Sequence, residues 1–519
     1  MLSILRKHTN PCDSLVYRLP PELLRKIILF LPDDDLIRAT HVCHHWRMVL
    51  LSAPTLWSHV DFSQLKRSRV FLERACEAPI HVTLGGELDE TTRGLLRDKV
   101  AQIVSVNCDV RTLKPDLAIY PMPFLRELNV TGNGDFSSLD IERQVGPFPS
   151  LTSLGVMQTI DGLYLRTPHL TNFRFRLHEP HRWRAEGGID LLVDFFRNCP
   201  MLEVVHVDFP GIPPGRMEVH NSYAVHLPHL CSFTQVYKMD DTAYPTELLD
   251  QLSFPPTCSI TLKLFIFGHE AADMRIHDLF PAAHFRETNF TDVRRVKIKV
   301  LPDPETKVPP NPFTETYRFG LIVELINAKG TKFSLDMIHM YDFLGESHGL
   351  PVSIRDMQPM LQEWVEEMGR YGSVETLCLE GHWNLGDFVT PGALSKINTL
   401  ILSDVCIPTW FFLHPMRPGG VRTFVLHFRS IHPQDADPTW ILMRLAKRQK
   451  MKGSPFEVVH LAYTDLGWFL PEEELGVITG CVGWLDICAG DNALDWNVDK
   501  HFLRGLEHCQ WFRMVPRFM

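Results

Sequence analysis

The 519-residue sequence predicts a small all-α segment followed by an irregular α/β solenoid. Apolar residues recur with helical periodicity in the first 62 residues, and a short apolar motif then returns along most of the chain. The composition, 45% hydrophobic and 22% charged, is that of a globular protein and excludes wholesale disorder. We predict four segments: a flexible N-terminus (1–14), the helical segment (15–62), the solenoid (63–480) and a C-terminal cap (481–519).

Charge and cysteine usage narrow the classes of partner and compartment. The chain has 52 basic and 62 acidic residues, a net charge of -10, which disfavours general binding to nucleic acid or to anionic membranes. Its 12 cysteines form no Cys-x-x-Cys pair, so we expect reduced thiols in the cytosol or nucleus. We see neither a secretory signal nor a run of 18 apolar residues, and we expect a soluble protein of the cytoplasm, the nucleus or both.

The helical segment begins with LPPELLRKIILFLP, Leu19 to Pro32. Its apolar residues recur at i, i+1, i+4, i+5 and i+8, which predicts an amphipathic helix that Pro32 ends. Asp33 to Asp35 cap a second helix, whose apolar stripe continues from Leu36 to Leu50. About 45 residues of short helices cannot bury a sufficient core alone, so this segment must pack on the rest of the chain, on a partner, or on both.

In order and spacing these residues resemble an F-box. The pattern consists of Leu19-Pro20, Glu22 to Leu24, Ile27, Leu31, Asp35-Leu36, Val42-Cys43, Trp46 and Leu56-Trp57. The resemblance implies docking on the Skp-type adaptor of a cullin–RING ubiquitin ligase. It also implies a set of residues that either contact the adaptor or fill the small core behind that interface: Leu19, Pro20, Ile28, Leu31, Leu36, Val42 and Trp46.

After a predicted helix (65–78) and strand (79–84), the solenoid repeats an apolar motif, and a proline often precedes each copy. The copies read LRELNV (125–130), LTSLGV (151–156), LTNFRF (170–175), LEVVHV (202–207), VETLCL (374–379), INTLIL (397–402), VRTFVL (421–426) and FEVVHL (456–461), with weaker ones at 230 and 293. Neighbouring copies within each half of the array start 19 to 35 residues apart, and these spacings scatter around the length of one structural repeat. Ordinary strands of an α/β or β-rich domain are the alternative.

The motif resembles leucine-rich repeats, although only Asn133 supplies the polar residue expected beyond the last apolar position. Thr159, His178, Pro210 and His382 take that place elsewhere, which predicts an irregular array. The layout is also similar to the large F-box families of mushroom-forming fungi. In this register the variable positions form an exposed sheet face, and we nominate eight of them as target contacts, the alternative being that they are simply solvated: Glu127, Asn129, Arg174, Arg176, His206, Asp208, His427 and His460.

Other motifs are weaker. Gly345 to Gly349 matches the nucleophile elbow G-x-S-x-G around Ser347, but Pro351 opposes the helix that this site needs. His41 to His45 reads HVCHH, yet helical neighbours cannot converge on one zinc ion. Met357 to Met368 is typical of a surface helix, and residues 302–312 of a Pro-rich loop. The basic run from Lys447 to Lys452 suits a solvated helix end more than a nuclear signal.

We therefore predict a substrate-recognition adaptor of an SCF-type ubiquitin ligase, with no catalytic site, metal or cofactor of its own. Its partners would be the Skp-type adaptor and, through it, cullin and RING-box protein, together with a target protein on the repeat region. An F-box scaffold that acts outside a ubiquitin ligase is the alternative. A serine hydrolase that uses Ser347 is the remote one.

Overall fold

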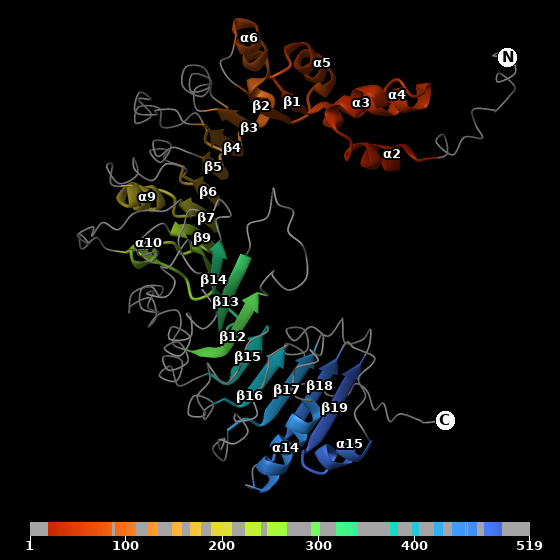
Figure 1. Ribbon diagram of the computed structural model, residues 1–519. Coiled ribbons are helices and arrows are strands. Elements are labelled where there is room, and N and C mark those ends of the chain that lie inside the picture. Colours follow the sequence, from red (N-terminus) through yellow and green to blue (C-terminus); the bar gives the residue numbers. More distant parts are fainter. Residues whose placement is uncertain are drawn as a thin grey trace, which may run out of the picture. The chain divides into compact units, whose positions relative to one another are not determined.

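Figure 1 shows the computed structural model. Its chain divides into two compact units. The first unit is Met1–Pro210 with Val225–Leu230, and the second is Gly211–Ala224 with Cys231–Met519. The residues it describes are 19–85, 89–109, 122–132, 148–157, 167–177, 188–209, 224–239, 247–266, 292–301, 318–340, 374–381, 397–403, 420–428, 438–451, 453, 455–463 and 472–489. In these ranges, no helix has the length and apolar character needed to cross a bilayer.

The first unit opens with four short helices: α2 (Pro21–Ile28), α3 (Asp33–Ala39), α4 (His44–Leu51) and the 3-10 helix η2 (Pro54–Trp57). Leu24 and Ile28 of α2 are buried with Val49 and Leu50 of α4. The side chain of Trp57 is fully buried, and its Nε1–H donates to the carbonyl of Leu50 at 3.0 Å. This hydrogen bond satisfies the only polar atom of the indole inside an apolar core.

The continuous apolar stripe expected from Leu36 to Leu50 is interrupted. Residues Thr40 to Cys43 form a turn between α3 and α4. Cys43 is the N-cap of α4, where its Sγ accepts a hydrogen bond from the backbone N–H of Trp46 at 3.5 Å. The pattern could not separate one long helix from two short ones, because the apolar spacing continues through the turn.

A parallel sheet follows in chain order, and each strand pairs with the next. Its strands are β1 (His59–Asp61), β2 (Ile80–Leu84), β3 (Ile103–Asp109), β4 (Glu127–Thr131), β5 (Ser153–Met157), β6 (Asn172–Arg176) and β7 (Val204–Phe209). The described connections contain α5 (Leu65–Ala75), α6 (Glu90–Lys99), the 3-10 helix η3 (Val100–Gln102) and α9 (Gly188–Arg197), and β8 (Val225–His226) completes the unit. One face of this sheet is apolar and buried, and Phe173 of β6 packs there on Phe195 of α9 at a ring distance of 4.5 Å.

The same turn precedes β4, β5, β6 and β7. In each, a buried leucine donates its backbone N–H to the carbonyl three residues earlier, and a proline takes the second position, as type I turns favour. The hydrogen bonds are Leu125 to Met122 (3.2 Å), Leu151 to Phe148 (3.2 Å), Leu170 to Thr167 (3.0 Å) and Leu202 to Cys199 (3.3 Å). The prolines noted in the sequence therefore mark turns that recur once per strand.

The second unit is also mostly parallel, with one antiparallel interruption. Its strands are β9 (Ser232–Met239), β10 (Leu252–Ser253), β11 (Ser259–Ile266), β12 (Val293–Leu301), β13 (Arg318–Asn327), β14 (Lys332–Met340), β15 (Thr376–Glu380), β16 (Thr399–Ser403), β17 (Thr423–Phe428), β18 (Val458–Tyr463) and β19 (Trp484–Ala489). Its described helices are α10 (Glu247–Asp250), α14 (Pro438–Met451) and α15 (Glu472–Thr479). β12, β13 and β14 pair antiparallel, and β14, not β12, pairs with β11.

All ten predicted repeat motifs contain a strand, and the helix and strand predicted at 65–84 are present as α5 and β2. The meander β12–β13–β14 breaks the order in which successive strands are neighbours, which the motif did not reveal. The basic residues Lys447, Arg448 and Lys450 lie in the last turns of α14. Several predictions fall outside the described residues: the N-terminal 1–14, the Pro-rich loop, the surface helix at 357–368, Ser347 and most of the cap.

Candidate functional site

Helix α2 carries two apolar stripes that face different surroundings. Leu24 and Ile28 form the buried stripe, while Leu23, Ile27 and Phe30 recur at i, i+4 and i+7 along a second, exposed one. At 100° per residue the two stripes point about 100° apart. Leu23 is 48% exposed and Phe30, just beyond the helix, is 87% exposed. Two of the five residues of the predicted apolar face, Leu23 and Ile27, are thus left exposed.

The exposed apolar residues concentrate in this helical segment. Among the described residues, seven of the thirteen exposed large apolar side chains lie between positions 23 and 51: Leu23, Ile27, Leu29, Phe30, Val42, Met48 and Leu51. We call these seven residues the apolar surface. A soluble protein rarely leaves so many large apolar side chains exposed in one short segment unless they meet a partner. Leu29, Phe30, Met48 and Leu51 were missed by the sequence analysis, although the periodicity of Leu23 and Ile27 includes Phe30.

The structure sorts the seven residues that the F-box resemblance nominated for adaptor binding. Ile28 and Leu36 are buried in the helical core. Pro20 and Val42 are exposed, and the remaining three, Leu19, Leu31 and Trp46, are half-buried. A polar substitution at Leu36 would therefore disturb the packing of the helical core, whereas one at Val42 would remove exposed apolar surface.

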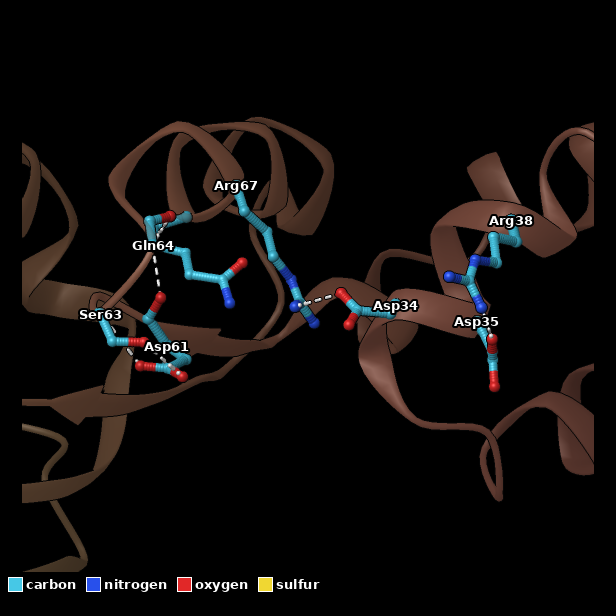
Figure 2. Close-up of polar contacts among 8 residues, drawn as sticks. Asp34, Asp35, Arg38, Asp61, Ser63, Gln64 and Arg67 are labelled. Carbon is cyan, nitrogen blue, oxygen red and sulfur yellow. Dashed lines mark hydrogen bonds and ion pairs between the residues drawn. The ribbon is translucent and has the colours of Figure 1, made fainter.

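The helical segment joins the sheet without an intervening linker, because β1 pairs directly with β2. Figure 2 shows Arg67 of α5 reaching Asp34 of α3, with Nη1 to Oδ1 at 2.7 Å. Asp61 of β1 accepts hydrogen bonds from both the backbone and the hydroxyl of Ser63, and so fixes the turn into α5 (Figure 2). Ser68 of α5 donates to the carbonyl of Asp61 at 2.6 Å.

Aromatic contacts strengthen this junction. Phe71 of α5 meets the buried Trp57 edge to face, with ring centroids 5.1 Å apart. The guanidinium of Arg74 lies over the same indole, with its Cζ 4.3 Å from the ring centroid. Burial, followed by the neighbouring Arg47, lowers the pKa of Arg74, and Glu73 opposes that shift. The helical segment and the start of the sheet therefore share one core.

The open face of the first sheet is lined in register by side chains that are polar except at Gly155 and Val204. One row contains His59, His81, Ser105, Glu127, Ser153, Asn172 and Val204, and the next contains Asp61, Thr83, Asn107, Asn129, Gly155, Arg174 and His206. Arg176 and Asp208 lie beyond them as an ion pair at 3.2 Å. We call these rows and this ion pair the polar face. All but Gly155 are half-buried or exposed, so six of the eight nominated target contacts lie together on this face.

Glu127 is the centre of a hydrogen-bond network on the polar face. Its carboxylate accepts from Ser105 Oγ at 3.2 Å and from Asn129 Nδ2 at 3.0 Å. Gly155 makes this arrangement possible, since a Cβ there would lie 2.2 Å from Asn129 Oδ1. The network holds Glu127 and Asn129 in fixed orientations before any partner arrives.

His81 makes folding sensitive to pH. Its half-buried ring stacks on His59 at 4.7 Å, and burial, followed by His59, lowers its pKa against the opposing effect of Glu127. The folded chain then binds the proton less well than the unfolded chain, so the stability contributed by neutral His81 is present above about pH 6.5 and is lost as pH falls through the folded pKa.

We expect His81→Gln to reduce the loss of Tm between pH 7 and pH 5. Thermal unfolding at both pH values, measured beside the wild type, checks this result. His226→Gln, at an exposed histidine of β8, is the control and should keep the wild-type pH dependence. An identical pH dependence in His81→Gln and the wild type would contradict the expectation.

The prediction that His427 lies on an exposed face is wrong, because its side chain is 5% exposed. Its Nδ1 lies 3.1 Å from the buried Ser403 Oγ on the neighbouring strand. The adjoining row of the same face, Cys378, Ile401 and Val425, is apolar and buried. Motifs such as INTLIL place apolar residues on both faces of the sheet. The face of β15–β17 that carries His427 is therefore buried, and not exposed as expected. His460 on β18 is half-buried.

The cysteines and histidines offer no metal site in the described part of the chain, where no group of three or more His, Cys, Asp or Glu could hold an ion. The HVCHH residues straddle the turn before α4, and Cys43 caps that helix. Burial raises the pKa of the Cys108 and Cys258 thiols to about 12 and that of Cys199 to about 11. These thiols stay protonated and unreactive as core residues.

Comparison with known protein families assigns the helical segment. Residues 16–63, which span α2, α3, α4, η2 and β1, match the family described as F-box-like. No curated protein matches the chain. Domains of this kind generally bind Skp-type adaptors. The chain therefore carries an F-box-like domain at residues 16–63, as its sequence predicted.

Proposed function

We propose that the chain is a substrate-recognition subunit of an SCF-type ubiquitin ligase. The apolar surface of the F-box-like domain carries the proposal, since seven large side chains are exposed there and a docking partner would remove them from water. Skp-type adaptor is the partner that the domain implies. The proposal assigns no bond chemistry to this chain and places its action in the cytoplasm, the nucleus or both.

The junction around Trp57 supports this role. A substrate receptor must hold its target at a defined position relative to the recruited ubiquitin-conjugating enzyme, which a flexible tether does poorly. Here β1, the last element of the F-box-like domain, is also the first strand of the sheet. We propose that this connection holds the polar face at a fixed position relative to the apolar surface, and that the polar face is the target-binding region.

We also propose that the strand arrays are irregular leucine-rich-repeat-like solenoids. Support comes from a backbone arrangement that recurs in both units, in which one carbonyl accepts from two consecutive N–H groups of the next strand. Examples are Arg126 O with Thr152 and Ser153 N–H, Thr152 O with Thr171 and Asn172 N–H, Glu375 O with Asn398 and Thr399 N–H, and Asn398 O with Arg422 and Thr423 N–H. Similarity to the fungal F-box families remains a prediction.

Co-purification tests the ligase role directly. The full chain, expressed with a tag in cells, is expected to bring down the Skp-type adaptor together with cullin and the RING-box protein. Recovery of the adaptor without cullin would contradict a ligase role and favour a scaffold outside the ligase. Absence of the adaptor would contradict F-box docking altogether.

A further inference from the structure

Arg174 is the arginine of the polar face that has no carboxylate partner among the described residues. It lies at the middle of β6 and is exposed, between the buried Phe173 and Phe175. Its neighbours in register are Gly155 and His206, neither of which is acidic. The other arginine of the face, Arg176, already pairs with Asp208.

The carboxylate of Glu127, in the adjoining row, already has hydrogen-bond partners within the polar face. Glu127 accepts hydrogen bonds from Ser105 and Asn129, so neither of its oxygens is free of a donor. Asn129 leans over Gly155, where β5 has no side chain, and its carboxamide thus occupies the position in the row next to Arg174. A fixed amide, which can donate and accept, then adjoins an exposed guanidinium.

We propose that the polar face binds an extended polypeptide segment of the target and that an acidic residue of this segment pairs with Arg174. This inference rests on the proposed function and names the class of segment recognised. A guanidinium fork matches a carboxylate in bidentate geometry. Asn107, which is exposed, and Asn129 would hydrogen-bond the peptide groups of the same segment.

The spacing of the strands sets the size of the segment. Asn107 on β3 and Arg174 on β6 are three strand positions apart in one register row. At about 4.8 Å per strand this row covers about 14 Å, or about four residues of extended chain. The net charge of -10 argues against nucleic acid as the anionic occupant.

Peptide selection tests the proposal. The full chain, co-purified with the adaptor, is applied to an array of random 12-residue peptides, half with free and half with amidated C-termini. We expect the wild type to select Asp or Glu. Selection confined to free C-termini, without a preference for Asp or Glu, would contradict the proposal, because the carboxylate would then come from the end of the peptide chain. Arg174→Glu should lower the affinity for the selected peptides at least about tenfold, and this variant should select Lys or Arg instead. Arg126→Glu, at an exposed arginine outside the polar face, is the matched control and should behave as wild type.

A second variant tests the positioning of Asn129. Gly155→Ala places a methyl group against Asn129 Oδ1. This variant should bind the selected peptides several-fold more weakly while keeping the preference for acidic residues. Three further results would overturn the proposal: no peptide selected by the wild type, selection indifferent to charge, or a profile unchanged in Arg174→Glu. Whether the adaptor stays bound in the same samples distinguishes failure of this inference from failure of F-box docking. A chain that retains the adaptor but lacks acidic selection contradicts this inference alone, whereas acidic selection without the adaptor contradicts F-box docking alone.

Discussion

Replacing Leu23 and Phe30 by aspartate is expected to abolish binding of the Skp-type adaptor while leaving the chain folded. Both side chains are exposed in the free protein, at 48% and 87%, so the folded state loses little packing. Leu23 lies in the first turn of α2, where an acidic residue is favourable for the helix. In a complex, however, two apolar anchors would be lost and two carboxylates would need to be desolvated.

The expected loss is at least about 100-fold in affinity, since each large apolar anchor contributes about 2 kcal/mol and 1.4 kcal/mol corresponds to tenfold. Titration of the purified chain with the adaptor, by calorimetry or interferometry, measures it. Phe124→Asp with Met451→Asp is the matched control, because Met451 is as exposed as Phe30, at 87%, and both positions lie outside the F-box-like domain. If the control lost adaptor binding as strongly as the Leu23 and Phe30 variant, the apolar surface would not be the docking site.

The sequence predicted elements well wherever local spacing alone decides them. Leu128 and Val130 of β4 alternate with polar residues, and the structure buries the first set and leaves the second on the polar face. The F-box pattern was equally readable, because its residues occur at fixed offsets along one continuous segment. Such predictions need no knowledge of which distant segments meet.

Features that depend on distant segments were not predictable in this way. Leu23 and Leu24 are adjacent leucines with the same propensity, yet only Leu24 faces α4 and is buried. The motif at 293 contains a strand, but its pairing with β13 in place of β11 is decided by residues far along the chain. His427 directly follows its motif, as Asp208 follows LEVVHV, yet His427 is buried and Asp208 is half-buried, because the second unit buries the face that the first leaves open.

Loss of the Trp57 side chain is expected to loosen the F-box-like domain and the start of the sheet together. Trp57→Ala removes a fully buried indole, which costs about 3–5 kcal/mol in protein cores. It also removes the ring that Phe71 and Arg74 both contact. The carbonyl of Leu50 keeps a partner in the N–H of Ala53, so most of the cost comes from the cavity and not from an unpaired acceptor.

Hydrogen exchange can locate this effect, which a single unfolding midpoint of so long a chain cannot. We expect Trp57→Ala to speed exchange of the amides in α4 and α5 by about 100-fold or more, with β16 and β17 of the second unit unchanged. Asp34→Ala is the comparison, since the Arg67 ion pair has a partner whose side chain is 70% exposed and contributes less than about 1 kcal/mol. If α4 exchanged faster in Trp57→Ala while α5 kept its wild-type protection, the two would not share a core. The apolar surface and the polar face would then be joined by a hinge, and a target on the sheet would no longer be held at a fixed distance from the adaptor.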